Sequence, residues 1–205
     1  MRFHELPQTQ DRSLPNVRMR WLILAIQEQM GPHGLRMILR QADLIKYSQS
    51  PPPANNALET RTSEYARLLA TVRTYFGLGA RGTLTRIGRS VFRQQLAERP
   101  SWIAWRWIIR PFLSTQRRLG WILTQVASGM AAPDGSVRID RAGEGFWLID
   151  RTSDRTLGVT SEQPICWSAV GELSEAVMWA TREDVPIREV DCRAAGKDSC
   201  RFAIL

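Results

Sequence analysis

Residues 189–202 read EVDCRAAGKDSCRF and contain two of the three cysteines of the chain. The third is Cys166, and the 165 residues before it contain none. An odd number of cysteines argues against a simple disulfide framework. The chain does not open on a secretory signal, so we expect a cytoplasmic, reducing setting, where clustered cysteines more often bind metal. Thiolate suits zinc, and a carboxylate can complete a tetrahedral site.

The same stretch predicts a β-hairpin that brings its cysteines together. Residues 186–193 and 199–205 alternate as strands do, and residues 195–198, AGKD, have turn chemistry. Such a hairpin places Cys192 and Cys200 on opposite sides of one turn.

Two further residues can join this pair. Glu189 lies three residues before Cys192, and residues at odd spacing on a straight strand face opposite ways. For both to reach one ion, Cys192 has to lie at a bulge or beyond the strand end. Cys166 opens a predicted helix at residues 167–181, and a helix N-terminus stabilises a thiolate. From spacing alone, these residues form either a zinc site or a set of buried thiols with a surface glutamate.

The order of Glu189, Cys192, Gly196, Cys200 and Phe202 resembles the tail of the 4-vinyl reductase domain family. This family is related to the TRAPP trafficking subunits and to the sensor domains of phenol- and xylene-responsive bacterial activators. Its members also have a cysteine just before a helix with small residues.

The second part of the resemblance lies in the helix at residues 167–181. Here Cys166 is followed by Ala169, Gly171 and Ala176. The resemblance covers residues 60–205. It implies a structural zinc ion, whose ligands would be Cys166, Glu189, Cys192 and Cys200.

Charge is unevenly distributed along the chain, whose net charge is +8. Residues 1–130 carry 19 basic and 7 acidic side chains, whereas residues 131–205 carry 9 basic and 13 acidic ones. A basic half is typical of proteins that bind nucleic acid or anionic membranes. All but two of the 28 basic residues are arginine, which indicates a coding bias as much as a binding surface. We therefore do not expect specific nucleic-acid binding, and we keep peripheral membrane contact as an alternative.

Apolar periodicity predicts helices over the first two thirds of the chain. The predicted ranges are 17–30, ended by Gly31-Pro32, a short helix around 35–39, then 58–76, 83–97, and 101–130 with an interruption at Pro111. Residues 77–82, GLGARG, formally match a dinucleotide-binding pattern, but the preceding segment has helical periodicity. We therefore interpret them as a helix end followed by a helix start.

From residue 132 the period changes to that of strands. Residues 136–141 and 146–149 are predicted strands, and the helix and hairpin described above follow them. This order predicts an α+β fold, in which helices cover an antiparallel four-stranded sheet, with an N-terminal helical extension. Residues 48–56 contain three consecutive prolines and read as a linker. We therefore divide the chain into an extension with linker, residues 1–57, and a 4-vinyl reductase-like ligand-binding domain, residues 58–205, with the zinc site.

Catalysis finds little support in the sequence. The two histidines, His4 and His33, lie in the extension, and the chain has no Walker A, G-x-S-x-G or H-E-x-x-H motif. A zinc ion held by four protein ligands has no open position for water and is structural. We therefore favour a non-enzymatic module.

The resemblance implies a sensor or carrier, because the sensor members of the family bind hydrophobic or aromatic ligands. We expect the pocket between the helices of residues 83–128 and the strand at 146–149. That strand is apolar at four consecutive positions, so we expect the tryptophan-rich helices on one face and the late helix on the other. The candidate lining residues are Trp147, Trp105, Phe112 and Trp121.

Two alternatives come from other members of the family. One is a protein of bacteriochlorophyll biosynthesis that would bind a tetrapyrrole, either a tetrapyrrole vinyl reductase or an accessory protein of the 4-vinyl reductase type. Because the sequence supplies no hydride donor, we favour the accessory protein. The other is a dimeric scaffold like the trafficking subunits. Because the family tends to pair, we also expect a homodimer formed through the helical layer.

Overall fold

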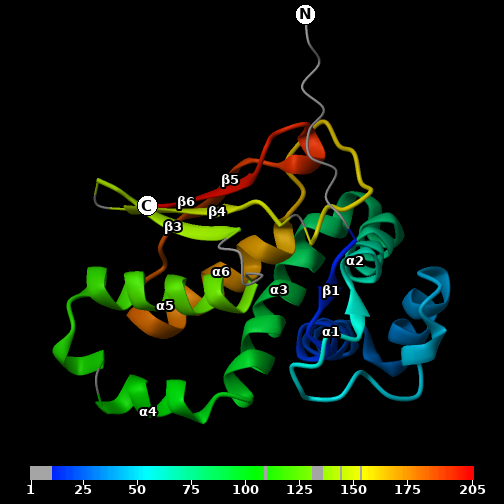
Figure 1. The fold of residues 1–205 in the computed structure, drawn as a ribbon, viewed down its shortest axis with the longest axis horizontal. Helices are drawn as coiled ribbons and strands as arrows, with labels where there is room; N and C mark the ends of the chain where they lie inside the picture. Colours follow the sequence, from blue (N-terminus) through cyan, green and yellow to red (C-terminus); the bar gives the residue numbers. More distant parts are fainter. Residues whose placement is uncertain (1–10, 109, 131–135, 144, 153) are drawn as a thin grey trace, which may run out of the picture.

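A four-stranded antiparallel sheet lies on one side of the molecule, and helices pack beneath it (Figure 1). The computed structural model describes residues 11–108, 110–130, 136–143, 145–152 and 154–205. The strands are β3 (Val137–Ala142), β4 (Gly145–Asp150), β5 (Ile187–Asp191) and β6 (Cys200–Ile204), in the order β3-β4-β6-β5. This arrangement confirms the predicted α+β fold and its helix-covered sheet.

The N-terminal part is dominated by α1 (Asn16–Gln41), a helix with a bend. The sequence predicts two helices separated at Gly31-Pro32, and α1 does break there into two helical arms that meet at a kink. Gly31 has a φ of 71° and a ψ of 171°, a conformation that glycine adopts without a steric penalty. The short elements around α1 are η1 (Ile45–Tyr47) and the strands β1 (Ser13–Leu14) and β2 (Thr60–Arg61), which pair with each other.

The middle of the chain is helical, as predicted. Its elements are α2 (Thr62–Phe76), η2 (Gly77–Gly79), α3 (Ala80–Ala97), α4 (Pro100–Ile108), η3 (Arg110–Phe112) and α5 (Thr115–Met130). Gly77 has a φ of 51° and ends α2, so the glycine run is a helix end and a helix start. The long stretch at 101–130 is interrupted at Pro111, which lies within η3.

The helix α3 crosses α6 (Trp167–Thr181) so closely that their backbones touch. A Cβ atom built on Gly88 would lie 1.9 Å from the carbonyl oxygen of Ser168, and one on Gly171 would lie 2.0 Å from that of Thr85. Real Cβ atoms do not approach so near, so only glycine permits this crossing.

Because of this crossing, α3 lies between two apolar cores (Figure 1). One core joins α1, α2 and α3, and contains Leu22, Leu68 and Ile87. The other lies between the sheet and α4, α5 and α6. The extension thus packs on α2 and α3, and the division at residue 57 stays a prediction. Among the described residues, no helix is long and apolar enough to cross a membrane.

Candidate metal centre

Three short segments converge at one end of the sheet and bring the four predicted ligands together. Cys166 precedes the first turn of α6, Glu189 lies on β5, and Cys200 is the first residue of β6. Cys192 comes directly after β5 and leads into η4 (Arg193–Ala195). One possible donor atom from each residue, three Sγ and one carboxylate oxygen, lies within 4.8 Å of every other.

A bulge in β5 allows Glu189 and Cys192 to point towards the same site despite their odd spacing. Glu189 pairs with Phe202 and Asp191 pairs with Arg201, so the register shifts between them. The extra residue turns the end of the strand, and Cys192 follows it outside the ladder. Both conditions named from the sequence, a bulge and a position beyond the strand end, are therefore present.

The sulfur atoms are spaced as ligands of one metal ion. Cys166 Sγ lies 3.9 Å from Cys192 Sγ and 3.6 Å from Cys200 Sγ. A disulfide requires about 2.05 Å, and all three cysteines are free. A tetrahedral zinc with Zn–S bonds of about 2.3 Å separates its sulfurs by about 3.8 Å. The observed distances therefore fit a zinc ion.

The carboxylate of Glu189 has one oxygen available for the same ion. The backbone N–H of Cys166 donates to Oε2 at 2.8 Å. Oε1 is buried, and no hydrogen-bond partner is found for it in the described part of the chain. An unpaired buried oxygen costs about 1–3 kcal/mol or more, and coordination of a cation would remove that cost.

The close packing of four titratable side chains shifts their pKa values in the metal-free site. Burial, together with the charge of Cys192, raises the pKa of Glu189 to about 8. Contacts with Cys192 and Cys200 raise the pKa of Cys166, and burial adds to the effect. Contacts with the other two thiols lower the pKa of Cys192. The site thus holds protons that a bound metal would displace.

Positive charge reaches the centre from an element that sequence spacing did not indicate. Three thiolates and a carboxylate around Zn²⁺ leave a charge of −2, and in sequence the cations nearest the ligands are Arg188, Arg193, Lys197 and Arg201. Arg201 instead pairs with Asp191 at 3.2 Å. Arg73 of α2 lies near enough for the charges of Cys166 and Cys192 to act on its pKa, which burial lowers and these charges raise. Only the tertiary packing of α2 reveals this residue.

Two of the predicted ligand-binding residues lie together in a tryptophan cleft. Trp105 and Trp121 stack with ring centroids 3.7 Å apart and planes inclined by 7°. The cleft has a volume of about 410 Å³, within the range of small-molecule sites. It is lined by Ser101, Trp102, Ala104, Trp105, Ile108, Trp121 and Gln125. Trp102 was not among the predicted lining residues, although its spacing of three from Trp105 on one helix indicates a shared face.

The other two predicted residues lie elsewhere. Phe112 is 86% exposed on η3. Trp147 lies on the sheet face away from the helices, where the guanidinium of Arg201 stacks on it at 4.6 Å. Phe146 and Leu148, its neighbours on β4, belong to the core between sheet and helices.

The expectation that α6 covers the second face of β4 is therefore wrong, because α5 and α6 lie beneath the same face (Figure 1). Because residues 146–149 are all apolar, hydrophobicity alone did not show which alternate residues of β4 face the helices.

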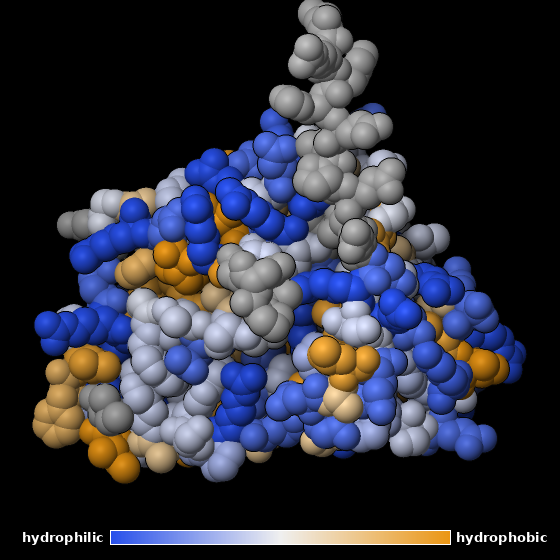
Figure 2. Space-filling model, viewed as in Figure 1, coloured by the Kyte–Doolittle hydropathy of each residue, from blue (hydrophilic) through white to orange (hydrophobic). Residues whose placement is uncertain are grey.

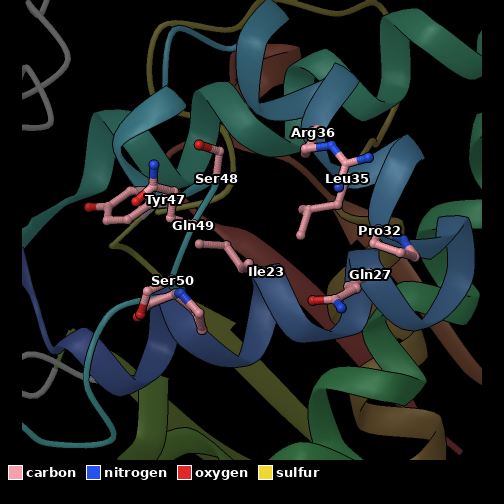
Figure 3. Close-up of a pocket in the computed structure, with 10 residues that line it drawn as sticks. Ile23, Gln27, Pro32, Leu35, Arg36, Tyr47, Ser48, Gln49 and Ser50 are labelled. Atoms are coloured by element: carbon pink, nitrogen blue, oxygen red, sulfur yellow. The ribbon is translucent and has the colours of Figure 1, made fainter.

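Other hollows in the described part of the structure were not predicted. A cavity of about 130 Å³ lies between the two arms of α1 and the segment after η1, with Ile23, Gln27 and Leu35 around it (Figure 3). It is smaller than the roughly 300 Å³ of typical ligand sites. A cleft of about 460 Å³ lies beside the metal centre and is lined by Arg73, Thr74, Gly77, Thr160, Ser161, Glu162, Gln163, Ile165 and Trp167.

Solved structures with a similar fold align with nearly the whole chain. An H-NOX protein from S. oneidensis in the Fe(II)NO ligation state aligns with a TM-score of 0.58 and 14% identity, covering 94% of this chain and 98% of that one. A Tt H-NOX double variant aligns with a TM-score of 0.55 and 15% identity, covering 93% of each chain. A structure described under "Modulating Heme Redox Potential Through Protein-Induced Porphyrin Distortion" gives a TM-score of 0.55 at 12% identity, covering 93% of this chain and 98% of that one.

Comparison of sequences identifies the part of the chain that carries the thiol cluster. No curated protein matches the chain. Residues 156–205 match the model of the 4-vinyl reductase domain, and they include all four residues of the candidate metal centre. This match confirms the assignment of the C-terminal part of the chain to the 4-vinyl reductase domain family.

Proposed function

We propose that the protein is a non-enzymatic small-molecule-binding module, a sensor or carrier, whose sheet is held to α6 by a structural zinc ion. The observation that carries the ligand-binding role is the tryptophan cleft between α4 and α5. Its walls are apolar rings, and Ser101 and Gln125 supply polar groups at its edge. A cleft of this kind suits a flat, apolar or aromatic ligand.

In this proposal the zinc site stabilises the fold, and the tryptophan cleft binds the ligand. Its ligands would be Cys166, Glu189, Cys192 and Cys200, and the three cysteines are at most 3% exposed. Four protein ligands in a buried site leave no position for a substrate, so zinc would stabilise the fold. Three unpaired, buried thiols also fit a reducing compartment such as the cytoplasm.

A tetrapyrrole is the second candidate ligand, as in an accessory protein of bacteriochlorophyll biosynthesis. It is favoured by the fold shared with a structure whose description names heme and porphyrin. The residues do not favour heme itself. The described histidine, His33, lies on the exposed side of α1, and the cysteines face one another. The tetrapyrrole would therefore be held by ring stacking, without a histidine bound to iron.

Native mass spectrometry of freshly purified protein tests the proposal, because it reports metal, ligand and oligomeric state together. We expect one zinc per chain and an added apolar mass. The same spectrum tests the predicted homodimer.

A matched pair of variants then locates the ligand. Trp121→Leu should weaken the binding of aromatic probes and keep the zinc, whereas Trp107→Leu, which alters an exposed ring outside the cleft, should bind them normally. Equal binding by both variants would refute the placement of the ligand in the cleft. Failure of aromatic probes to raise the melting temperature of the wild type would refute the ligand-binding role.

A further inference from the structure

An exposed apolar surface surrounds the turn from α4 to α5. Four large apolar side chains within ten residues are solvent-exposed: Ile103 by 43%, Trp107 by 71%, Ile108 by 66% and Phe112 by 86%. We call these four residues the α4–η3 surface. Apolar residues gather at the corresponding corner of the molecule (Figure 2). Groups of this kind on a protein surface mark interaction sites.

Arginines surround this surface, and acidic residues are missing from the segment that carries it. Residues 99–130 contain five arginines and no aspartate or glutamate. Arg106, Arg118 and Arg182 lie close enough to Arg110 that their charges add to burial in lowering its pKa. Glu183, two residues after α6, accepts a hydrogen bond from the Thr115 hydroxyl at 3.0 Å. The positive charge is therefore left for an external partner.

The charge also distinguishes among possible partners. In a symmetric dimer built on this surface, the arginines of one copy would face those of the other, which is unfavourable. A bilayer with anionic headgroups offers both components that the surface needs, an apolar layer and negative phosphates. Exposed tryptophan and phenylalanine beside arginine are the typical composition of segments that lie in a membrane interface.

We propose that the α4–η3 surface binds anionic lipid bilayers, with Trp107, Ile108 and Phe112 inserted among the headgroups and the arginines on lipid phosphates. The interaction is peripheral, because α4 spans only nine residues. The tryptophan cleft shares Ile108 with this surface, so the two sites adjoin. Membrane binding depends neither on the zinc ion nor on the identity of the ligand.

Vesicle flotation with the full chain tests the proposal. The probes are vesicles of phosphatidylcholine alone and of phosphatidylcholine mixed with phosphatidylserine. We expect binding to the mixed vesicles only, and weaker binding as salt screens the surface charges. Arg117→Gln should lower the affinity about fivefold, and Phe112→Ser on the order of tenfold.

Two control variants alter similar residues elsewhere. Leu78→Ser removes a fully exposed apolar side chain at the opposite end of α3, and Arg36→Gln removes an exposed arginine from α1. Both should bind like the wild type. The proposal is overturned if the wild type does not bind mixed vesicles, if it binds both kinds equally, or if Leu78→Ser loses as much affinity as Phe112→Ser. It is also overturned if Phe112→Ser converts a stable dimer into monomers while vesicle binding is unchanged.

Discussion

Replacement of Cys200 by serine should abolish binding of the proposed zinc ion and unfold the end of the sheet that carries the site. Cys200 begins β6, which pairs with both β4 and β5, so the residue lies where three strands meet. A serine hydroxyl is a poor zinc ligand and would be left in a position that is 2% exposed. Structural zinc sites contribute about 10–16 kcal/mol of apparent free energy, and whole domains are stable by only about 5–15 kcal/mol. The loss of zinc therefore exceeds what local packing can offset.

The measurement combines metal analysis with hydrogen exchange. We expect Cys200→Ser to hold less than half an equivalent of zinc and to lose amide protection in β5 and β6. The core formed by α1, α2 and α3 should stay protected longer, because it contains no ligand of the metal. Ala203→Ser is the matched control, since it places the same hydroxyl on the same strand at a buried position outside the site. If Cys200→Ser kept a full equivalent of zinc and melted like Ala203→Ser, Cys200 would not be a ligand.

Three further predictions concern other parts of the structure. In the metal-free protein, the pKa of Glu189 is raised to about 8, so its contribution to stability is fully present below pH 4.5 and is lost as the pH rises through about 8. Zinc binding would instead stabilise the protein more as the pH rises. Denaturation at several pH values, with Glu189→Gln as control, separates the two effects. Gly88→Ala should destabilise the fold by at least about 1–3 kcal/mol, because its Cβ would meet backbone, whereas Gly129→Ala in α5, where the nearest atom is 3.7 Å away, should be neutral or stabilising in urea denaturation. Arg18→Met should lower the free energy of unfolding by about 3–5 kcal/mol, because it leaves the fully buried carboxylate of Asp154 with one cation fewer. Arg93→Met, at a surface ion pair, should lower it by only about 0–1 kcal/mol. Equal losses for the two variants would contradict the description of the Arg18–Asp154 pair as a buried one.

Local sequence signals predicted that Cys166, Glu189, Cys192 and Cys200 lie together, because their arrangement is set over short distances. The turn residues at 195–198 predicted that Cys192 and Cys200 face each other across a hairpin. The odd spacing of Glu189 and Cys192 required a bulge or a strand end, and the structure has both. Cys166 could be placed because it directly precedes a helix. The role of these residues as zinc ligands stays a prediction.

Features that depend on the packing of distant elements could not be predicted in the same way. In β4 the residues of both faces are apolar, so hydrophobicity did not show that Trp147 faces away from the helices. Arg73 of α2 and Trp167 at the start of α6 line one cleft, a neighbourhood that depends on tertiary packing. The tryptophan stack likewise combines α4 and α5 with Trp179 of α6, which no short-range pattern links.

The buried charges bear on the predicted boundary at residue 57. Asp154, which is fully buried, receives hydrogen bonds from Arg12 and Arg18 of the extension, at 2.9 Å and 2.5 Å. Next to it in sequence, Arg155 pairs with Glu172 of α6. Removal of residues 1–57 would leave Asp154 without its partners in an apolar environment, and unpaired buried charges are among the most destabilising changes in a protein. We therefore expect the extension and the loop leading to Cys166 to fold and unfold together, although 136 positions separate Arg18 from Asp154 in sequence.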